Sequence, residues 1–177
     1  MIPPESGPFL FDTSAESWFG RNRNTEEWLR RYVIRHKIFV SSVTVVERIR
    51  GYALLWRQAS EHDRLLIDQR RTAYLARLGE VKVVDLPTAM AAAELMAAMP
   101  IPPTPPRRTH RLAESKQDRL VRWRFDCLIG ATAGVAGLPL VHNNPEDFEA
   151  IRSAIDSCRE RFPGLEPLKL IHCLSLL

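Results

Sequence analysis

The chain has 177 residues, of which 45% are hydrophobic, and this length and composition suit one globular domain with a sizeable core. The net charge of +4 allows contact with a polyanion but does not demand it. No apolar run approaches the roughly 20 residues of a membrane span, and the N-terminus lacks a signal-peptide pattern. We expect a cytoplasmic protein whose three cysteines are reduced and buried: Cys127, Cys158 and Cys173.

Short apolar runs, which predict strands, alternate along the chain with segments of helical periodicity. The expected strands are residues 9–11, 37–41, 81–84, 138–142 and 168–172. The expected helices begin with one that follows a capping motif at Asn24, and continue at about 44–59, 61–78, 88–99, 117–136 and 145–162. Gly79 and Gly137 are expected to end helices, because glycine accepts the left-handed conformation that follows a helix.

A proline-rich stretch interrupts this pattern at residues 100–106, where five of seven residues are proline. Proline can neither continue a helix nor lie within a central strand, so we expect an insertion loop over about 100–116. Strands on both sides of the loop are needed for one good core, which favours a single domain over residues 1–177. The alternation of strands and helices predicts an α/β fold with three α/β/α layers and a mainly parallel sheet of about five strands.

Four acidic residues stand at comparable places in this pattern. Asp12 ends the first apolar run, Glu47 follows the second by about one helical turn, and Asp126 interrupts an apolar helical segment. Asp147 follows the run that begins at Leu138. The carboxyl ends of parallel strands converge on one crevice, where gathered carboxylates repel each other unless a cation neutralises them. The first hypothesis is therefore a divalent metal site.

The sequence around these carboxylates forms four blocks, at residues 9–14, 40–51, 126–133 and 138–148. The first reads Phe-Leu-Phe-Asp-Thr-Ser, the second leads from a strand to a helical glutamate and Arg-Gly, the third reads Asp-Cys-Leu-Ile-Gly-Ala-Thr-Ala, and the fourth ends in Asn-x-x-Asp-Phe. In this order and spacing they resemble PIN domains, and they look most like the VapC-type toxins of bacterial toxin–antitoxin pairs. One departure is His142, which stands where the fourth block usually has threonine.

The resemblance implies a PIN-like fold and a metal-dependent endoribonuclease that uses Mg²⁺, or Mn²⁺, to hydrolyse RNA and leaves a 5′-phosphate and a 3′-hydroxyl. Asp12 and Asp126 are the expected metal ligands, and Glu47 and Asp147 would complete the site as further ligands or by orienting water. Supporting hydrogen bonds are expected from three side chains: Thr13, Ser14 and Asn144. The resemblance also implies a homodimer and a cognate antitoxin that silences it.

Simpler interpretations of the carboxylates stay open at this point. The spacing from Arg122 allows Asp126 an ion pair along a helix, and the spacing to Arg50 allows one for Glu47. Asp12 can cap a following helix, and Asp147 lies in the first turn of a helix, where the helix dipole favours a negative charge.

Two alternative functions also follow from the sequence. One is a PIN-domain nuclease for RNA processing outside a toxin system, and the other is a non-catalytic RNA-binding module on the same fold. Phosphate contacts are expected, on weaker grounds, from the basic part of the insertion: Arg107, Arg108 and Arg111.

Overall fold

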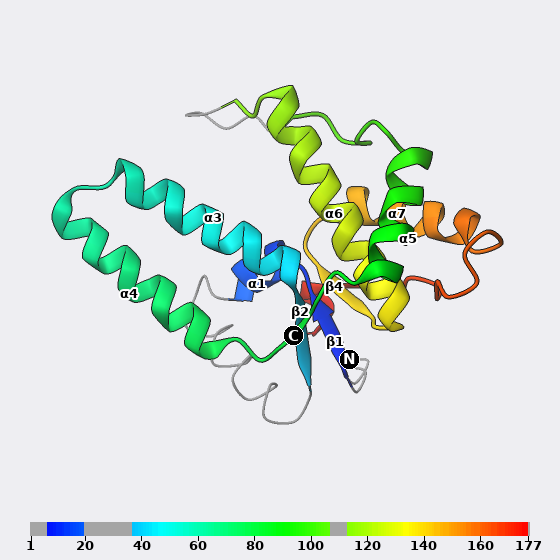
Figure 1. Ribbon diagram of the computed structural model, residues 1–177, viewed down its shortest axis with the longest axis horizontal. Helices are drawn as coiled ribbons and strands as arrows, with labels where there is room; N and C mark the ends of the chain where they lie inside the picture. Colours follow the sequence, from blue (N-terminus) through cyan, green and yellow to red (C-terminus); the bar gives the residue numbers. More distant parts are fainter. Residues whose placement is uncertain (1–6, 20–36, 107–112, 177) are drawn as a thin grey trace.

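The structure, a computed structural model, describes residues 7–19, 37–106 and 113–176. At its centre is a parallel sheet of five strands in the order β3-β2-β1-β4-β5 (Figure 1). The strands are β1 (Phe9–Phe11), β2 (Ile38–Ser41), β3 (Glu80–Lys82), β4 (Leu140–His142) and β5 (Leu170–His172). The predicted α/β fold with its parallel sheet is confirmed, and each strand lies within a few residues of its expected place.

The helices follow the predicted pattern with two additions. They are α1 (Thr13–Phe19), α3 (Ser42–Gln58), α4 (Glu61–Arg77), α5 (Leu86–Ala98), α6 (Lys116–Ala136) and α7 (Pro145–Cys158), and a short 3₁₀ helix, η1 (Cys173–Leu176), ends the described chain. Both α1 and η1 were missing from the predicted elements. The helix predicted after Asn24 lies outside the described residues. Of the described helices, none combines the length and the apolar character needed to cross a bilayer.

The central strands divide their side chains between two cores, which gives the fold its layers. Leu10 of β1 joins the larger core with residues of α5, α6 and α7, whereas Phe9 and Phe11 point to the other face and pack with α1 and η1. Successive side chains of a strand point to opposite faces, so a strand buried on both faces is apolar throughout. The sheet therefore lies between two helical layers, and the three cysteines are free and buried within these cores, as predicted.

Two glycines in α6 and its C-terminal turn serve different purposes. Gly137 has a φ of 62° and ends α6 in the left-handed conformation, as predicted. Gly130 lies where a Cβ would come within 2.5 Å of Ile151 Cγ2, so its small size lets α6 approach α7 closely. Gly79 directly follows the end of α4, as predicted, but the predicted left-handed conformation is wrong: Gly79 has no positive φ, since α4 ends in extended backbone at Leu78 and the chain runs directly into β3.

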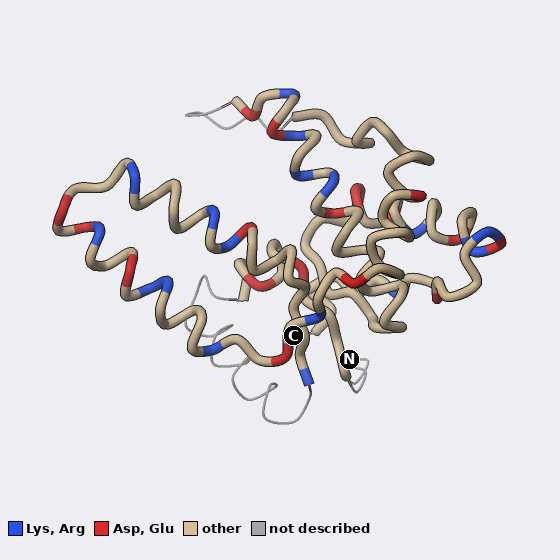
Figure 2. The backbone as a smooth tube through the Cα atoms, viewed as in Figure 1, with Lys and Arg blue, Asp and Glu red and all other residues tan. Residues whose placement is uncertain are grey.

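Helices α3 and α4 form a hairpin that extends away from the sheet (Figure 1). Both helices have the predicted helical periodicity, yet many of their large apolar side chains are exposed: Val46, Leu54, Leu55, Trp56, Leu65, Leu66 and Leu75. Arginines occur along both helices, and acidic residues lie among them mainly in α4 (Figure 2). The hairpin therefore offers an amphipathic surface that the described part of the chain leaves uncovered.

Candidate functional site

Asp12 follows the central strand β1 directly and begins helix α1. Its Oδ1 accepts a hydrogen bond from the Ala15 N–H at 2.6 Å, and its Oδ2 accepts one from the Ser14 hydroxyl at 2.7 Å. Ser14 in turn accepts a hydrogen bond at 3.0 Å from the backbone N–H of Asn143, just beyond β4. The helix-capping role allowed by the sequence is thus present, and it holds a buried carboxylate at the carboxyl end of the sheet.

Glu47 reaches the same end of the sheet from helix α3. It accepts a hydrogen bond from the Thr13 hydroxyl, so neighbouring side chains of α1 hold two different carboxylates. Nearby, Arg48 of α3 forms an ion pair with Glu16 of α1 at 2.7 Å, which joins the two helices. Glu47 is therefore oriented by a hydroxyl group beside Asp12.

Asp126 lies on the buried face of α6 and has the least satisfied carboxylate of the four. The side chain is buried, and among the described residues its Oδ2 has no hydrogen-bond partner. The ion pair with Arg122 that the helical spacing allowed is not formed, because Arg122 binds Glu114 and Asp147 instead. A buried acceptor without a partner costs free energy, so it requires an explanation beyond stability.

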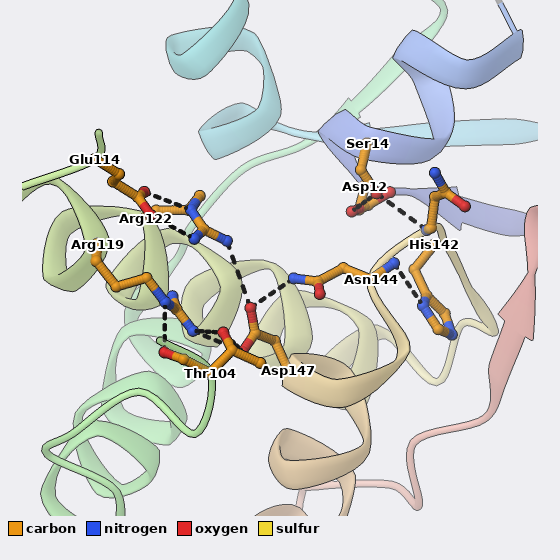
Figure 3. A network of polar contacts seen from close by, with 10 residues as sticks. Asp12, Ser14, Thr104, Glu114, Arg119, Arg122, His142, Asn144 and Asp147 are labelled. Atoms are coloured by element: carbon orange, nitrogen blue, oxygen red, sulfur yellow. Dashed lines mark hydrogen bonds and ion pairs between the residues drawn. The ribbon is translucent and has the colours of Figure 1, made fainter. Parts of the chain in front are cut away.

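Asp147 lies in the first turn of α7 and is completely buried. The fully buried Arg119 donates to its Oδ1 at 2.6 Å, and Arg122 lies 3.5 Å from its Oδ2 (Figure 3). Thr104 of the proline-rich stretch also donates to Oδ1, at 2.8 Å, and Asn144 donates to Oδ2 at 2.6 Å. The position in a first turn is confirmed, but the direct partners of Asp147 are side chains of α6, of the insertion and of the α7 N-cap residue Asn144.

His142, the departure from the family pattern, connects to this network through Asn144. Its Nδ1 accepts a hydrogen bond from the Asn144 N–H at 3.3 Å, and its ring packs against Phe148 and His172. Desolvation by burial, with a smaller contribution from the neighbouring His172, lowers the pKa of His142 to about 4. The neutral imidazole accepts as a threonine hydroxyl would, and it orients Asn144 instead of contributing charge.

The carboxylates lie near enough to one another to interact electrostatically. Desolvation raises the pKa of Asp126 well above its usual value, and the charges of Asp147, Asp12 and Glu47 raise it further. Desolvation is also the main cause that raises the pKa of Asp12 to about 6 and that raises the pKa of Glu47. Buried carboxylates that repel each other favour either protonation or a cation.

The residues present fit a hard divalent cation. The donor set is made of carboxylate oxygens, which Mg²⁺ and Mn²⁺ prefer, and Oδ2 of Asp126 supplies an acceptor that no group in the described part of the chain uses. Within the ranges that the structure describes, no three acidic, histidine or cysteine side chains already converge closely enough to surround one ion. The arrangement therefore resembles Mg²⁺ sites that use one or two carboxylates and several waters, rather than an all-protein cage.

Sequence reasoning missed three members of the network, Thr104, Glu114 and Arg119. Arg119 had a detectable signal, because it lies three residues before Arg122 and seven before Asp126, on one face of α6. The other two lie in the insertion and have no local pattern. The expected phosphate contacts, Arg107, Arg108 and Arg111, lie outside the described residues.

Comparisons with known proteins agree with this fold. The family model for the PIN domain matches residues 9–153. FitAcB from Neisseria gonorrhoeae is similar with a TM-score of 0.59 and 20% identity, over 96% of this chain and 100% of that chain. VapBC2 from Rickettsia felis, bound to a DNA fragment from its promoter, has a TM-score of 0.56 and 17% identity, over 93% and 97%. DNA-bound VapBC from Salmonella typhimurium has a TM-score of 0.56 and 20% identity, over 93% and 97%. No curated protein matches the chain by sequence.

Proposed function

This chain belongs to the PIN domain family, and we propose that it is a metal-dependent endoribonuclease, the toxin of a type II toxin–antitoxin pair. The observation that carries the nuclease proposal is the buried, unpartnered Oδ2 of Asp126, which faces the charges of Asp12, Glu47 and Asp147. An unpartnered buried acceptor does not stabilise the fold, whereas a metal centre needs such an oxygen as a ligand. We also propose that residues 1–177 form one PIN domain, since β4, after the insertion, pairs with β1, before it.

The metal centre would use Mg²⁺, with Mn²⁺ as an alternative. Asp12 and Asp126 are the proposed ligands, and Glu47 and Asp147 complete the acidic site as further ligands or by orienting water. When bound, the ion lowers the pKa of a coordinated water and holds the charge that develops on the leaving oxygen of a phosphodiester. Thr13, Ser14 and Asn144 are supporting residues, because each donates to one of these carboxylates.

The proposed substrate is RNA, cleaved by water attack to leave a 5′-phosphate and a 3′-hydroxyl. The net charge of +4 and the arginines of the insertion support contact with a phosphate backbone. Arg107, Arg108 and Arg111 are proposed to make that contact. We expect the target to be RNA in the cytoplasm, so we also propose that this protein is cytoplasmic.

The exposed apolar residues of the α3–α4 hairpin support a protein partner. Two hollows on this hairpin, of about 290 and 360 Å³, are lined by side chains that include Trp56, Ile67 and Leu66. The similar structures named above are VapBC and FitAcB, two of them with DNA. We propose that an antitoxin and a second copy of this chain are the partners of this protein, and that part of the hairpin is covered by them.

The nuclease proposal is tested with purified protein and a structured RNA. Cleavage is expected with Mg²⁺ or Mn²⁺ and not with EDTA, and Asp126→Asn should reduce the rate by at least 100-fold while the protein stays folded. Asp156→Asn is a matched control, because Asp156 is exposed on α7 and away from the site. If cleavage is undiminished in both Asp126→Asn and Asp12→Asn, the assignment of the site is wrong.

The two alternative functions are separated by other measurements. A non-catalytic RNA-binding module would bind RNA without cleaving it and would show no heat of Mn²⁺ binding in calorimetry. A PIN nuclease of RNA processing would cleave RNA, but its expression would not arrest growth and no neighbouring small protein would relieve an arrest. Growth arrest on expression, rescued by co-expression of the adjacent reading frame, is the result expected for a toxin.

A further inference from the structure

The carboxylate of Asp147 accepts three hydrogen bonds from the protein and lies beside a second guanidinium. Oδ1 accepts from the Thr104 hydroxyl at 2.8 Å and from Arg119 at 2.6 Å. Oδ2 accepts from Asn144 at 2.6 Å and lies 3.5 Å from an Arg122 nitrogen (Figure 3). No part of the side chain is exposed to solvent. Oδ1, with two donors, has little remaining capacity to coordinate an ion, and the positive charge of Arg122 beside Oδ2 disfavours a cation there.

Within the described residues, this network pairs opposite charges. Arg119 lies on Asp147, and Arg122 lies between Asp147 and Glu114. Arg122 holds Glu114 with two hydrogen bonds of 2.9 Å, and Arg119 is 1% exposed. A buried guanidinium of this kind requires a carboxylate partner, because an unpaired buried charge is strongly unfavourable. Asp147 is therefore committed to neutralising an arginine of its own chain.

The other three carboxylates are held differently. Asp12 accepts from the Ser14 hydroxyl and from a backbone N–H, and Glu47 accepts from the Thr13 hydroxyl. These donors are neutral, so they orient the carboxylates without cancelling their charge. Among the described residues, Oδ2 of Asp126 has no donor at all. The four acidic residues that the sequence places together thus divide into one that is neutralised and three that are not.

We propose that Arg119 and Thr104 form a clamp that removes Asp147 from the metal-binding set and makes it a positioning residue, which leaves the cation to Asp12 and Asp126, with Glu47 as a further ligand or to orient water. The inference rests on the proposed metal-dependent function and narrows its ligand set. Through the clamp, Asp147 fixes Asn144 at the start of α7 and ties the insertion to the acidic site, because Thr104 also accepts a hydrogen bond from Arg119 through its carbonyl oxygen, at 3.1 Å.

Calorimetric titration with Mn²⁺ distinguishes the ligands from the clamp. The informative variant is Arg119→Gln with Asp147→Asn, which removes both charges together and keeps amide groups that can hydrogen-bond. We expect its Mn²⁺ affinity to stay within about threefold of the wild type, whereas Asp126→Asn should lose at least tenfold. RNA cleavage by the double variant should fall through kcat, with little change in the Mn²⁺ concentration that gives half-maximal rate, because the site is less well positioned but still loads.

The clamp would be overturned if the double variant lost as much Mn²⁺ affinity as Asp126→Asn. Its far-UV circular dichroism must match that of the wild type, which shows that the variant is folded. Should the double variant not fold, anomalous diffraction from the wild-type protein crystallised with Mn²⁺ decides the same question. Asp147 is expected to remain on Arg119, and direct coordination of Mn²⁺ by Asp147 contradicts the proposal. Absence of Mn²⁺ binding to the wild type would instead remove the metal-dependent function, and this inference with it.

Discussion

Replacing Asp12 by asparagine should stabilise the metal-free protein at neutral pH. Burial raises the pKa of Asp12 from 3.8 to about 6, and each pKa unit corresponds to about 1.4 kcal/mol. Keeping this carboxylate ionised therefore costs the fold about 3 kcal/mol at pH 7. Asparagine carries no charge, and its Oδ1 can still accept from the Ala15 N–H, since asparagine is as good a helix cap as aspartate.

One hydrogen bond offsets part of this gain. The Ser14 hydroxyl now donates to Asp12 Oδ2 and accepts from the Asn143 N–H. The amide NH₂ of asparagine would force that hydroxyl to turn its hydrogen elsewhere, at a cost of about 1 kcal/mol. The expected net stabilisation is about 2 kcal/mol at pH 7, which for a chain of this size corresponds to a rise in Tm of roughly 4–8 °C.

The direction in which the free energy of unfolding changes with pH shows whether the ionisation of Asp12 is the cause of the stabilisation. Because the folded pKa of Asp12 is raised, the wild type is most stable when the group is protonated, and it loses that stability as the pH rises from about 4 to about 6. At pH 4.5 the carboxylate costs only about 1 kcal/mol, so the advantage of Asp12→Asn should vanish there. Urea denaturation in EDTA at the two pH values measures both differences.

Added Mn²⁺ should reverse the order of stability. An ion at about 100 times its Kd stabilises the wild type by about 2.7 kcal/mol, and the variant gains less because it lacks a ligand. Asp156→Asn, on the exposed face of α7, is the control and should show neither effect. The reasoning fails if Asp12→Asn is less stable than the wild type at pH 7 in EDTA, or if its advantage is the same at pH 4.5.

Three further changes test other parts of the structure. Gly130→Ala should destabilise the fold by about 1–3 kcal/mol, because the new Cβ would lie 2.5 Å from Ile151 Cγ2. As a control, Gly51→Ala on an exposed part of α3 should stabilise it by about 0.5–1 kcal/mol. Equal effects of the two changes in urea titrations would show that α6 and α7 do not approach closely at Gly130. Arg119→Met alone should cost about 3 kcal/mol, since it leaves the buried Asp147 carboxylate with only the longer ion pair to Arg122, and a change below 1 kcal/mol would argue against the ion pair. Cys127, whose pKa burial raises to about 12, should react with a thiol reagent at pH 8 only as the protein unfolds, and rapid native labelling would contradict its buried position.

Much of the fold could be read from local sequence. A strand buried on both faces is mostly apolar, so Phe9–Phe11 and the run that leads into Leu140–His142 were recognisable as strands. Asp12 was placed correctly because it follows such a strand directly. The exception was Gly79, where a local rule predicted a left-handed turn that the direct path from α4 into β3 does not use.

Long-range partners could not be read in the same way. Helical periodicity in α3 and α4 identified an apolar face, but only the arrangement of the elements left Val46 and Leu66 of those faces exposed. Whether an amphipathic face is covered depends on what packs against it, and periodicity contains no information about that partner.

The sequence by itself determined the family, the order of the strands and helices along the chain, and the four acidic positions. Tertiary structure decided how those four differ. Asp147 meets Arg119, which is 28 residues earlier, and Thr104, which is 43 residues earlier. Contacts over such separations follow from how α6, α7 and the insertion pack, and no local pattern encodes them. Packing therefore sets apart a neutralised Asp147 from Asp12, Glu47 and Asp126, whose negative charges a cation can still balance.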